Sequence, residues 1–519
     1  MNLSGENPAT ASNAAVPWGM AFLDLDGFQV DRELIAAFPA KTLFETGALP
    51  LDKSGDRVRV AVSDPHNFAA LDELTAFSGF LLEPVVADPN LIRQLLRQTL
   101  GVGGGMVSGA SEQLLSQSQG DPLQQVLDST ENAAIVRFTR ELLRDACQQG
   151  ASDIHLEPDE ERLSLRFRID GVLRLQQVPP EIHSHREAII SRFKILSKLN
   201  IAEKRLPQDG GFQFEIAGRE IDARTSVIPM KHGEGIVLRI LDRGRVDYSL
   251  SNLGFPQELR AQWERLIRRT AGLVLVTGPT GSGKTTTLYG SIASLRSPEL
   301  KIITIEDPIE YTLSGINQVQ VQPNVGLTFA AGLRSLLRHD PDVILIGEIR
   351  DKETAVNAIQ AALTGHMVFS TLHTNDAATA VTRLVDMGIE PFLVSATLSG
   401  VLAQRLVRKL CTHCRKPVRV DQLDLPSDFP RSNAEILYEA QGCRQCHGIG
   451  YLGQVGIFEL MELDHQIRKM ALQGDSPYDI QAYAATRGML SMRQSGWQNV
   501  IQGRTSIEEV LRTTAWDMQ

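Results

Sequence analysis

The chain of 519 residues has few cysteines, only 6% aromatic residues and no excess of positive charge. No run of about eighteen apolar residues occurs, so we expect no membrane-spanning helix. Residues 1–17 have neither a basic start nor an apolar core, which excludes a secretory signal and predicts a disordered N-terminus in a cytosolic protein. With 52 basic and 62 acidic residues, the net charge is −10, which argues against broad contact with nucleic acid.

Four of the five cysteines fall in two C-x-x-C pairs, namely Cys411, Cys414, Cys443 and Cys446. Disulfides are rare in a reducing compartment, so this spacing indicates a metal. Four thiolates from two such turns satisfy tetrahedral Zn²⁺ with no open position, which predicts a structural zinc site. The alternative is four reduced cysteines without metal. The neighbouring His413 and His447 are expected to be bystanders, because the cysteine set is already complete.

The most informative stretch is a glycine-rich segment that follows an apolar run at residues 273–276. A buried strand, a G-x-x-x-x-G-K-[ST] turn and a helix together form a phosphate site, in which backbone N–H groups and the helix N-terminus face the phosphates. Lys284 would reach the outer phosphates, and Thr285 would hold Mg²⁺. The residues expected to contact nucleotide are Gly278, Pro279, Thr280, Gly281, Ser282, Gly283, Lys284, Thr285 and Thr286.

Three further apolar runs, at residues 302–305, 343–346 and 367–371, alternate with helical patterns such as residues 353–363. Short, continuously apolar runs are typical of parallel strands that are buried on both faces. We therefore predict an α/β fold: a doubly wound, RecA-like P-loop core whose ligands gather at the carboxyl ends of the strands.

We divide the rest of the chain by composition and periodicity. A small α/β domain, with a strand at 58–62 and a helix at 91–96, precedes a stretch rich in Gly, Ser and Gln that is typical of a flexible linker. A turn at residues 450–456 and a capping box at Thr505 and Glu508 are expected near the end. The predicted domains are 18–100 (N-terminal), 101–125 (linker), 126–245 (arginine-bearing α/β subdomain), 246–406 (P-loop domain), 407–450 (zinc module) and 451–519 (helical).

Residues 163–169 and 221–227 alternate between apolar and polar side chains, as half-buried strands do, and Asp170-Gly171 predicts a hairpin. Four arginines fall on these and nearby strands: Arg166, Arg168, Arg224 and Arg239. They form either a solvated strand face or a set of arginine fingers for a neighbouring nucleotide, and the pattern leaves both interpretations open.

Acidic and histidine residues follow the predicted strands of the P-loop domain. Glu348 ends one strand, where it could bind Mg²⁺ through water or orient the attacking water, and Glu310 belongs to an acidic group that follows another strand. His366 and His373 flank the strand predicted beside the phosphate loop, and either could sense the γ-phosphate. Spacing alone does not show which of the two glutamates acts on the attacking water.

The segments GPTGSGKTTT, TIEDPIEY, LIGEIRD and TGHMVFSTLHTN resemble the Walker A, aspartate, Walker B and histidine boxes of the bacterial secretion-ATPase superfamily. ASDIHLEP, FRIDGVL and IAEKRLPQDG resemble its arginine-bearing subdomain, and residues 387–411 are most similar to the type II secretion ATPases, the GspE family. The resemblance implies a homohexamer that uses ATP, Mg²⁺ and Zn²⁺, with Glu310 as catalytic glutamate and Glu348 as the Walker B acid. It also implies that the four arginines face nucleotide.

The resemblance further implies a cytoplasmic motor, peripheral at the inner membrane, that drives pseudopilus assembly and protein export. The expected partners are an inner-membrane platform protein and, through residues 18–100, the cytoplasmic part of a bitopic inner-membrane protein. The alternative within the superfamily is a type IV pilus assembly ATPase. A nucleic-acid translocase is a further alternative. Cyclic-dinucleotide binding by the first domain is disfavoured, because the Arg-Leu-Gly opening of that motif is missing before Phe28.

Overall fold

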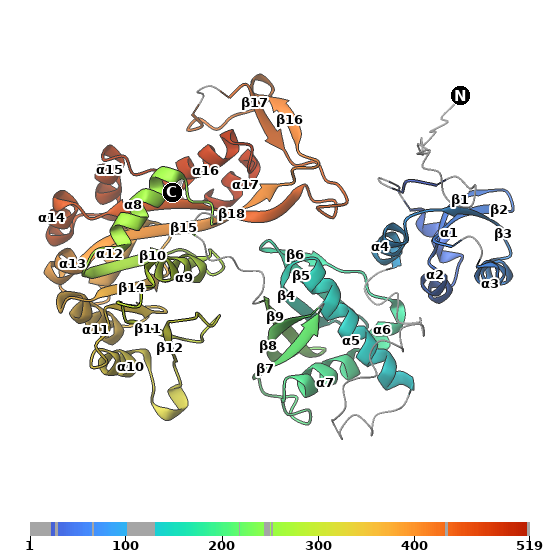
Figure 1. Cartoon of the computed structure of the whole chain (residues 1–519), viewed down its shortest axis with the longest axis horizontal. Coiled ribbons are helices and arrows are strands. Elements are labelled where there is room, and N and C mark those ends of the chain that lie inside the picture. Colours follow the sequence, from blue (N-terminus) through green and yellow to red (C-terminus); the bar gives the residue numbers. More distant parts are fainter. Residues whose placement is uncertain are drawn as a thin grey trace. The chain divides into compact units, whose positions relative to one another are not determined.

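The computed structural model describes residues 22–25, 28, 30–64, 67–100, 130–216, 218–242, 250, 253–430 and 434–515 (Figure 1). The predicted disordered N-terminus and the whole of the predicted linker lie outside these residues. The chain divides into two compact units, residues 1–244 and 245–519, and each is described by itself. In the described part of the chain, every helix is too short or too polar to cross a bilayer.

The first part of the N-terminal unit is a small α/β domain with a three-stranded sheet in the order β1-β2-β3. β1 is antiparallel to β2, and β2 is parallel to β3. Leu43, Leu49, Val60 and Ile92 are fully buried in its core. The predicted strand and helix are confirmed as β2 and α4. The elements are α1 (Arg32–Ala36), α2 (Ala40–Thr46), β1 (Ala48–Ser54), β2 (Arg57–Val62), α3 (Phe68–Ser78), β3 (Leu81–Val86) and α4 (Pro89–Leu100).

The second part of this unit is a six-stranded antiparallel sheet in the order β6-β5-β4-β9-β8-β7. Phe138 of α5 and Phe193 of α7 pack with Phe167 of β5 in one core, so the helices cover one face of the sheet. Asp170 and Gly171 both have positive φ, at 49° and 80°, which confirms the predicted hairpin between β5 and β6. The elements are α5 (Thr130–Gln148), β4 (Ala151–Pro158), β5 (Leu163–Ile169), β6 (Val172–Leu175), α6 (Pro180–Ser184), α7 (Arg186–Leu196), β7 (Gln208–Ile216), β8 (Arg219–Met230) and β9 (Gly233–Asp242).

The second unit contains a seven-stranded sheet in the order β12-β11-β13-β14-β10-β15-β18. All neighbouring strands are parallel except β15 and β18. Helices α8 and α9 cover one face, and α10 to α15 cover the other. The predicted doubly wound, RecA-like fold is confirmed. The first elements are α8 (Gln257–Ile267), β10 (Gly272–Thr277), α9 (Lys284–Leu295), β11 (Ile302–Glu306), β12 (Asn317–Gln320), η3 (Pro323–Val325), α10 (Phe329–Leu336), β13 (Val343–Ile346), α11 (Lys352–Leu363), β14 (Met367–Leu372), α12 (Ala377–Asp386) and α13 (Pro391–Thr397).

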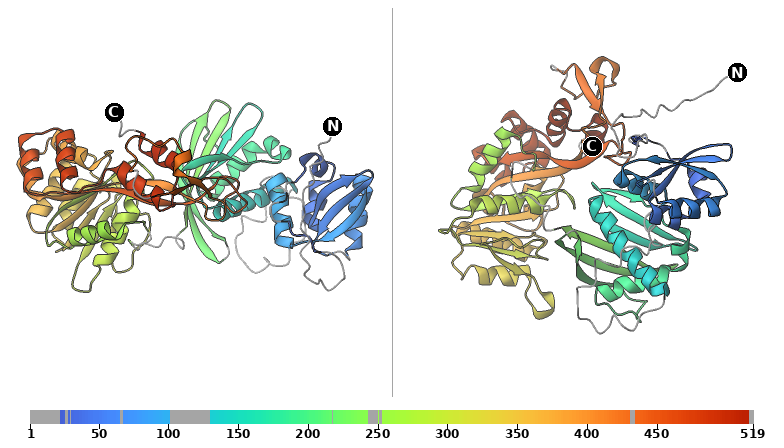
Figure 2. Two further views of the ribbon diagram at one scale, coloured as in Figure 1. Left: turned by 90° about the horizontal axis from the view of Figure 1, so that it is seen from above. Right: turned by 45° about the vertical axis from the view of Figure 1, so that its right-hand side comes forward.

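The prediction of a helical region over residues 451–519 is wrong at its start, because residues 451–462 form a long strand, β18, where a turn was expected, and the helices begin only at residue 465. β18 pairs with β15 from Gly400 to Leu410, so both strands extend past the parallel sheet towards the hairpin of β16 and β17 (Figure 2). β18 is buried on both faces over most of its length, which removes the period-two pattern of a strand. The remaining elements are β15 (Leu398–Leu410), β16 (Lys416–Arg419), η4 (Val420–Gln422), β17 (Ile436–Glu439), β18 (Tyr451–Glu462), α14 (His465–Gln473), α15 (Pro477–Thr486), α16 (Met492–Ile501) and α17 (Ile507–Thr513).

The predicted capping box at Thr505 and Glu508 is also wrong by one residue. Ser506 caps α17, and its hydroxyl accepts a hydrogen bond from the backbone N–H of Glu509 at 3.2 Å. Thr505 is buried and donates instead to the backbone oxygen of Arg408 at 2.8 Å. The two hydroxyls are adjacent in sequence, and the pairing of the chain with β15 decides which of them caps the helix.

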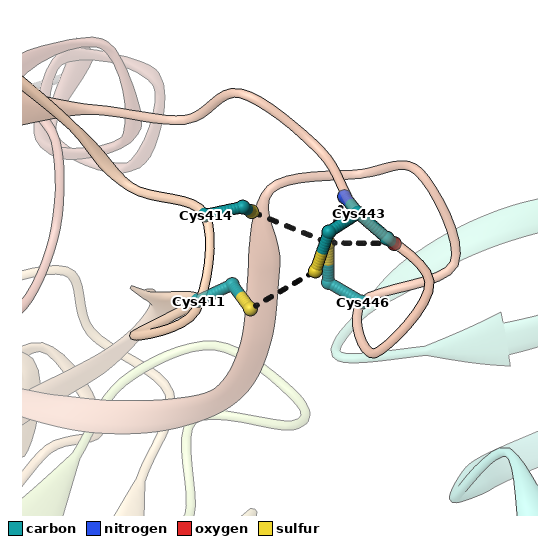
Figure 3. Close-up of side chains that lie close together, drawn as sticks. All are labelled: Cys411, Cys414, Cys443 and Cys446. Atoms are coloured by element: carbon teal, nitrogen blue, oxygen red, sulfur yellow. Dashed lines mark hydrogen bonds between the residues drawn. The ribbon is translucent and has the colours of Figure 1, made fainter. Parts of the chain in front are cut away.

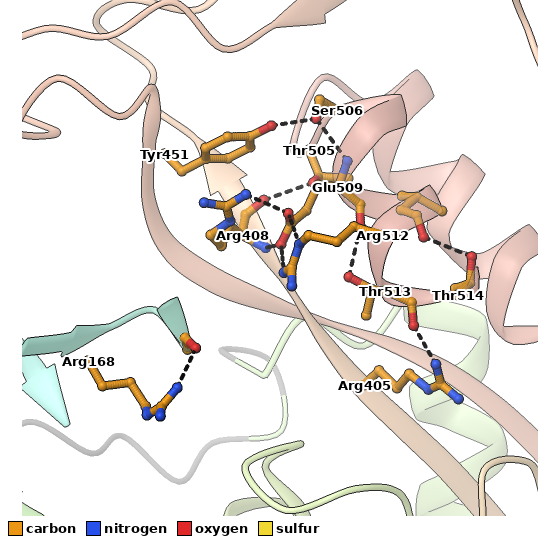
Figure 4. A network of polar contacts seen from close by, with 12 residues as sticks. Arg168, Arg405, Arg408, Tyr451, Thr505, Ser506, Glu509, Arg512, Thr513 and Thr514 are labelled. Atoms are coloured by element: carbon orange, nitrogen blue, oxygen red, sulfur yellow. Dashed lines mark hydrogen bonds and ion pairs between the residues drawn. The ribbon is translucent and has the colours of Figure 1, made fainter. Parts of the chain in front are cut away.

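Glu509 ties α17 to β15 through a buried ion-pair network (Figure 4). Its carboxylate lies 2.7 Å from Nη2 of Arg408 and 2.6 Å from Nη2 of Arg512, and its side chain has no exposed surface. The Arg408 guanidinium also stacks on Tyr451 of β18, with its carbon 4.1 Å from the ring centre. Burial alone would raise the pKa of Glu509, but the hydrogen bonds from Arg512 and Arg408 outweigh it and lower the pKa.

We predict that Glu509→Gln destabilises this unit by about 3–5 kcal/mol, because the largely buried Arg408 loses the charge that compensates its burial. The exposed neighbour Glu508 gives the control, and Glu508→Gln should unfold like the wild type. The pKa of Glu509 is lower in the folded state. Its stabilisation is therefore complete above the unfolded pKa of about 4.3 and is lost as the pH falls through the folded pKa. The midpoint of thermal unfolding of Glu509→Gln should lie well below that of Glu508→Gln at pH 7, and this difference should narrow below about pH 4. A difference independent of pH would contradict this account.

Candidate functional site

The predicted phosphate loop joins β10 to α9. Gly278, Gly281 and Gly283 have φ values of 145°, 78° and 85°, a region that favours glycine. No side chain caps α9, so the cap position at Gly283 leaves the helix N-terminus open to an anion. The hydroxyl of Ser282 is buried without a hydrogen-bond partner, and Thr285 is exposed at the first turn of α9. The loop therefore has the form that a triphosphate with Mg²⁺ requires.

Gln404 of β15 holds the phosphate loop through side-chain hydrogen bonds, and no motif in the sequence singled it out. Its Nε2 donates to the backbone oxygen of Ser282 at 2.8 Å, and its Oε1 accepts from the hydroxyl of Thr287 at 2.6 Å. A Cβ at Gly278 would lie 2.3 Å from the Gln404 backbone oxygen. This close approach explains why the first loop position requires glycine.

Lys284 and Glu348 lie near each other, at the edge of the sheet where the parallel strands end. Lys284 Nζ donates to the backbone oxygens of Gly278 at 2.8 Å and Pro279 at 3.0 Å. Burial lowers the pKa of Lys284, and the charge of Glu348 partly offsets this effect. Glu348 also pairs with Arg350 and lies 3.2 Å from Nε2 of His373. The predicted Walker B acid, one of the predicted histidines and the phosphate-loop lysine are thus brought together.

The two predicted histidines lie at opposite ends of strand β14. β14 is parallel to β10, His373 follows its carboxyl end, and His366 precedes its first residue. The Nδ1 of His366 lies 2.9 Å from the backbone oxygen of Ala361, in the last turn of α11. The expectation that His366 faces the γ-phosphate is therefore wrong for the phosphate loop of its own chain, because its strand separates it from that loop.

Three of the four predicted arginines lie in one row across the sheet of the N-terminal unit, on the face opposite α5 and α7. The row runs from Arg168 on β5 through Asp153 on β4 to Arg239 on β9 and Arg224 on β8. The Asp153 carboxylate lies 3.1 Å from Nε of Arg239 and 3.7 Å from Nε of Arg168. Arg168 also donates from Nη1 to the backbone oxygen of Gly171 at 3.0 Å (Figure 4).

The fourth arginine, Arg166, pairs instead with Glu157 on β4.

Asp153 was missed as a site residue. Its only signal was its place in the segment ASDIHLEP, and spacing along the chain does not show that one carboxylate orients two arginines. A fixed row of this kind presents guanidinium groups with little loss of side-chain entropy, which suits recognition of phosphate.

The four predicted cysteines converge between β15 and β18 (Figure 3). Their sulfur atoms all lie within 4.8 Å of one another, and three of the pairs are 3.7 to 3.8 Å apart. A tetrahedron with Zn–S bonds of about 2.3 Å has S···S edges of about 3.8 Å. The thiols therefore fit a closed, structural zinc site.

Backbone N–H groups surround these sulfurs. Those of Cys443 and Gly450 each lie 3.1 Å from Sγ of Cys446. Burial alone would raise the pKa of Cys446, but these N–H groups outweigh it and lower the pKa to about 7. Such hydrogen bonds favour the thiolate, the form that binds zinc. The exposed His413 and His447 lie outside the cluster.

Comparisons with known proteins agree with this site. The family model described as "Type II/IV secretion system protein" matches residues 128–512, and the "MshEN domain" model matches residues 18–106. Type IV pilus assembly ATPase PilB of Myxococcus xanthus is 41% identical over 96% of this chain and 90% of its own length. Type II secretion system protein HxcR of Pseudomonas aeruginosa is 49% identical over 75% of this chain and 79% of its own length.

Type II secretion system ATPase E of Vibrio cholerae is 48% identical over 75% of this chain and 77% of its own length. The ATPase DotB of Legionella pneumophila shares the fold, with a TM-score of 0.53 and 23% identity over 72% of this chain and 94% of that structure. The family match and these identities confirm the resemblance drawn from the motifs. The chain therefore belongs to the type II/IV secretion system protein family, as an ATP hydrolase of the secretion and pilus ATPases.

Proposed function

We propose that this protein is the motor ATPase of a type II secretion system. In this account a homohexamer at the cytoplasmic face of the inner membrane hydrolyses ATP to drive pseudopilus assembly and the export of folded proteins. The observation that carries the proposal is the cluster of Lys284, Glu348 and His373 at the phosphate loop. It occurs in a chain that is 47–49% identical to type II secretion proteins over about three quarters of its length.

Phosphoryl transfer to water depends on positioning and on neutralising charge, with little covalent chemistry for the protein to perform. In the proposed reaction the phosphate loop and Lys284 hold the β- and γ-phosphates, while Thr285 and, through water, Glu348 hold Mg²⁺. The ion supplies positive charge at the phosphates when it is bound. Glu310 orients the attacking water, and His373 senses the γ-phosphate through its contact with Glu348.

The arginine row is proposed to complete this site from another copy of the chain in the hexamer. The supporting observation is that Asp153 engages Nε of both Arg168 and Arg239 and so fixes the direction of each side chain. A preorganised positive group at a transferring phosphoryl group stabilises the transition state. This function explains why a strand face that would otherwise be solvated carries so many arginines.

Residues 18–100 are proposed to dock on the cytoplasmic part of a bitopic inner-membrane protein, while the ring contacts an inner-membrane platform protein. The domain has its own core, with Leu43 and Ile92 fully buried, so it can hold a partner while the ATPase unit turns over. In this account the protein is cytoplasmic and only peripheral at the membrane.

Type IV pilus assembly is the second candidate, and one observation favours it. The pilus assembly ATPase of Myxococcus xanthus aligns with 96% of this chain, slightly more than the 90% of a type II protein of Xanthomonas campestris and more than the 75% of the type II proteins of Pseudomonas aeruginosa and Vibrio cholerae. The longer alignment includes the N-terminal domain, which is the part proposed to choose the membrane partner.

Deleting the gene in its host distinguishes the two machines. We expect exoproteins to accumulate in the periplasm, while surface pili and twitching motility stay normal, and a plasmid-borne wild-type copy should restore export. Lost pili with normal export would contradict the type II assignment and move the protein to pilus assembly.

A further inference from the structure

Tyr289 lies in α9, the helix that begins in the phosphate loop, and its role is not explained by packing alone. The side chain is fully buried in the core with Val276 and Phe369. Its hydroxyl donates a hydrogen bond to Oε2 of Glu306, the last residue of β11. A hydroxyl in this position links the phosphate-loop helix to a second strand of the sheet.

Glu306 is a fixed acceptor inside the core. Its side chain is 3% exposed, and its Oε1 accepts hydrogen bonds from the hydroxyl of Thr304 at 2.6 Å and from Nε2 of Gln318 at 3.1 Å. With Tyr289 on Oε2, three neutral donors hold this carboxylate in place. Such hydrogen bonds fix the position of Glu306, which therefore has a structural role. The acid that we assign to catalysis is Glu310.

The loop that carries Glu310 is anchored to the same network. Gln318 Nε2 donates to the backbone oxygen of Tyr311 at 2.9 Å, and its Oε1 accepts from the backbone N–H of Leu313 at 2.7 Å. The Tyr289 hydroxyl is therefore linked to this loop through Glu306 and Gln318. Burial and then the charge of Glu306 raise the pKa of Tyr289, so its hydroxyl stays protonated as a donor to Glu306.

We propose that Tyr289 is a positioning residue, which sets the place of Glu310 relative to the phosphate loop. One rigid helix carries both Lys284 and Tyr289, and hydrogen bonds through Glu306 and Gln318 link the Tyr289 hydroxyl to the backbone of Tyr311, the residue after Glu310. A change in the position of α9 is therefore transmitted to the acid that orients water. The inference rests on the proposed catalytic role of Glu310.

Tyr289→Phe tests the proposal, because it keeps the buried ring and removes only the hydroxyl. We expect kcat for ATP hydrolysis to fall about 10- to 100-fold, as misplaced catalytic groups do. The KM for ATP should stay within about twofold, since the groups that bind nucleotide are unchanged. Ser291→Ala is the matched control. It removes another buried hydroxyl of α9, which accepts from Trp263 Nε1 at 2.9 Å, and it should leave kcat within about twofold of the wild type.

A double-mutant cycle separates positioning from general destabilisation. In a Glu310→Gln background, Tyr289→Phe should have no further effect on kcat, because the group that it positions is already lost. Independent, multiplicative effects of the two changes would overturn the proposal while leaving the role of Glu310 intact. A wild-type kcat for Glu310→Gln alone would overturn both the role of Glu310 and this proposal. A wild-type kcat for Tyr289→Phe would overturn the proposal alone.

Discussion

Replacing Lys284 by alanine should reduce ATP hydrolysis by about 10²–10³-fold, the usual effect of removing one preorganised donor to a developing charge. Lys284 is the residue of the phosphate loop that carries positive charge to the outer phosphates. Its ammonium group donates to two backbone oxygens of its own loop, and burial lowers its pKa. Steady-state phosphate release at saturating ATP measures the effect.

The fold should survive this substitution. A buried ammonium with a lowered pKa is held at some energetic cost, so alanine should keep or slightly raise the midpoint of thermal unfolding. Lys469, an exposed lysine on α14, provides the matched control, and Lys469→Ala should hydrolyse ATP at the wild-type rate. Lys284→Ala with wild-type hydrolysis would show that the phosphate loop is not the site of turnover.

Loss of zinc should have the second large effect, this time on stability. We expect the purified protein to hold about one Zn²⁺ per chain and Cys446→Ser to lose it, because a structural site needs all four thiolates. Structural zinc contributes about 10–16 kcal/mol of apparent binding free energy in small zinc peptides. The region around β16, β17 and α16 should therefore unfold well below the wild-type temperature when zinc is absent.

Metal analysis together with thermal unfolding tests this expectation. His413→Ala is the control, because His413 lies in the first C-x-x-C turn but outside the thiol cluster. It should keep both the metal and the unfolding temperature. Wild-type protein without bound zinc, or a Cys446→Ser variant as stable as the wild type, would show that the four cysteines are reduced thiols that carry no metal.

Local patterns were enough to predict the strands that end at the active-site edge. β10 is a continuous apolar run before a glycine-rich turn, and β13 is a continuous apolar run before Glu348. The C-x-x-C spacing likewise predicted four converging thiols. For the strands, the signal and the structure lie within a few residues, so no knowledge of distant pairing was required. The two C-x-x-C turns are 32 residues apart, and they could be joined because one zinc site needs four thiolates.

Features that depend on pairing between distant segments were missed or misjudged. Asp153 contacts Arg239 across 86 residues of chain, and Gln404 contacts Thr287 across 117. Strand direction determines which histidine lies beside the phosphate loop. Because β14 is parallel to β10, only its carboxyl end, and hence only His373, lies there. Strand β18 was missed because it is buried on both faces and so lacks alternation.

Export by cells whose only copy of the gene carries Lys284→Ala tests most directly the claim that ATP turnover in this protein powers secretion. The measurement is the fraction of a secreted enzyme found outside the cells, with Glu299→Gln as control because Glu299 is exposed in the loop between α9 and β11. We predict that the enzyme is retained in the periplasm of the Lys284→Ala strain, although the protein is made at its normal level. Wild-type export by that strain would contradict the account.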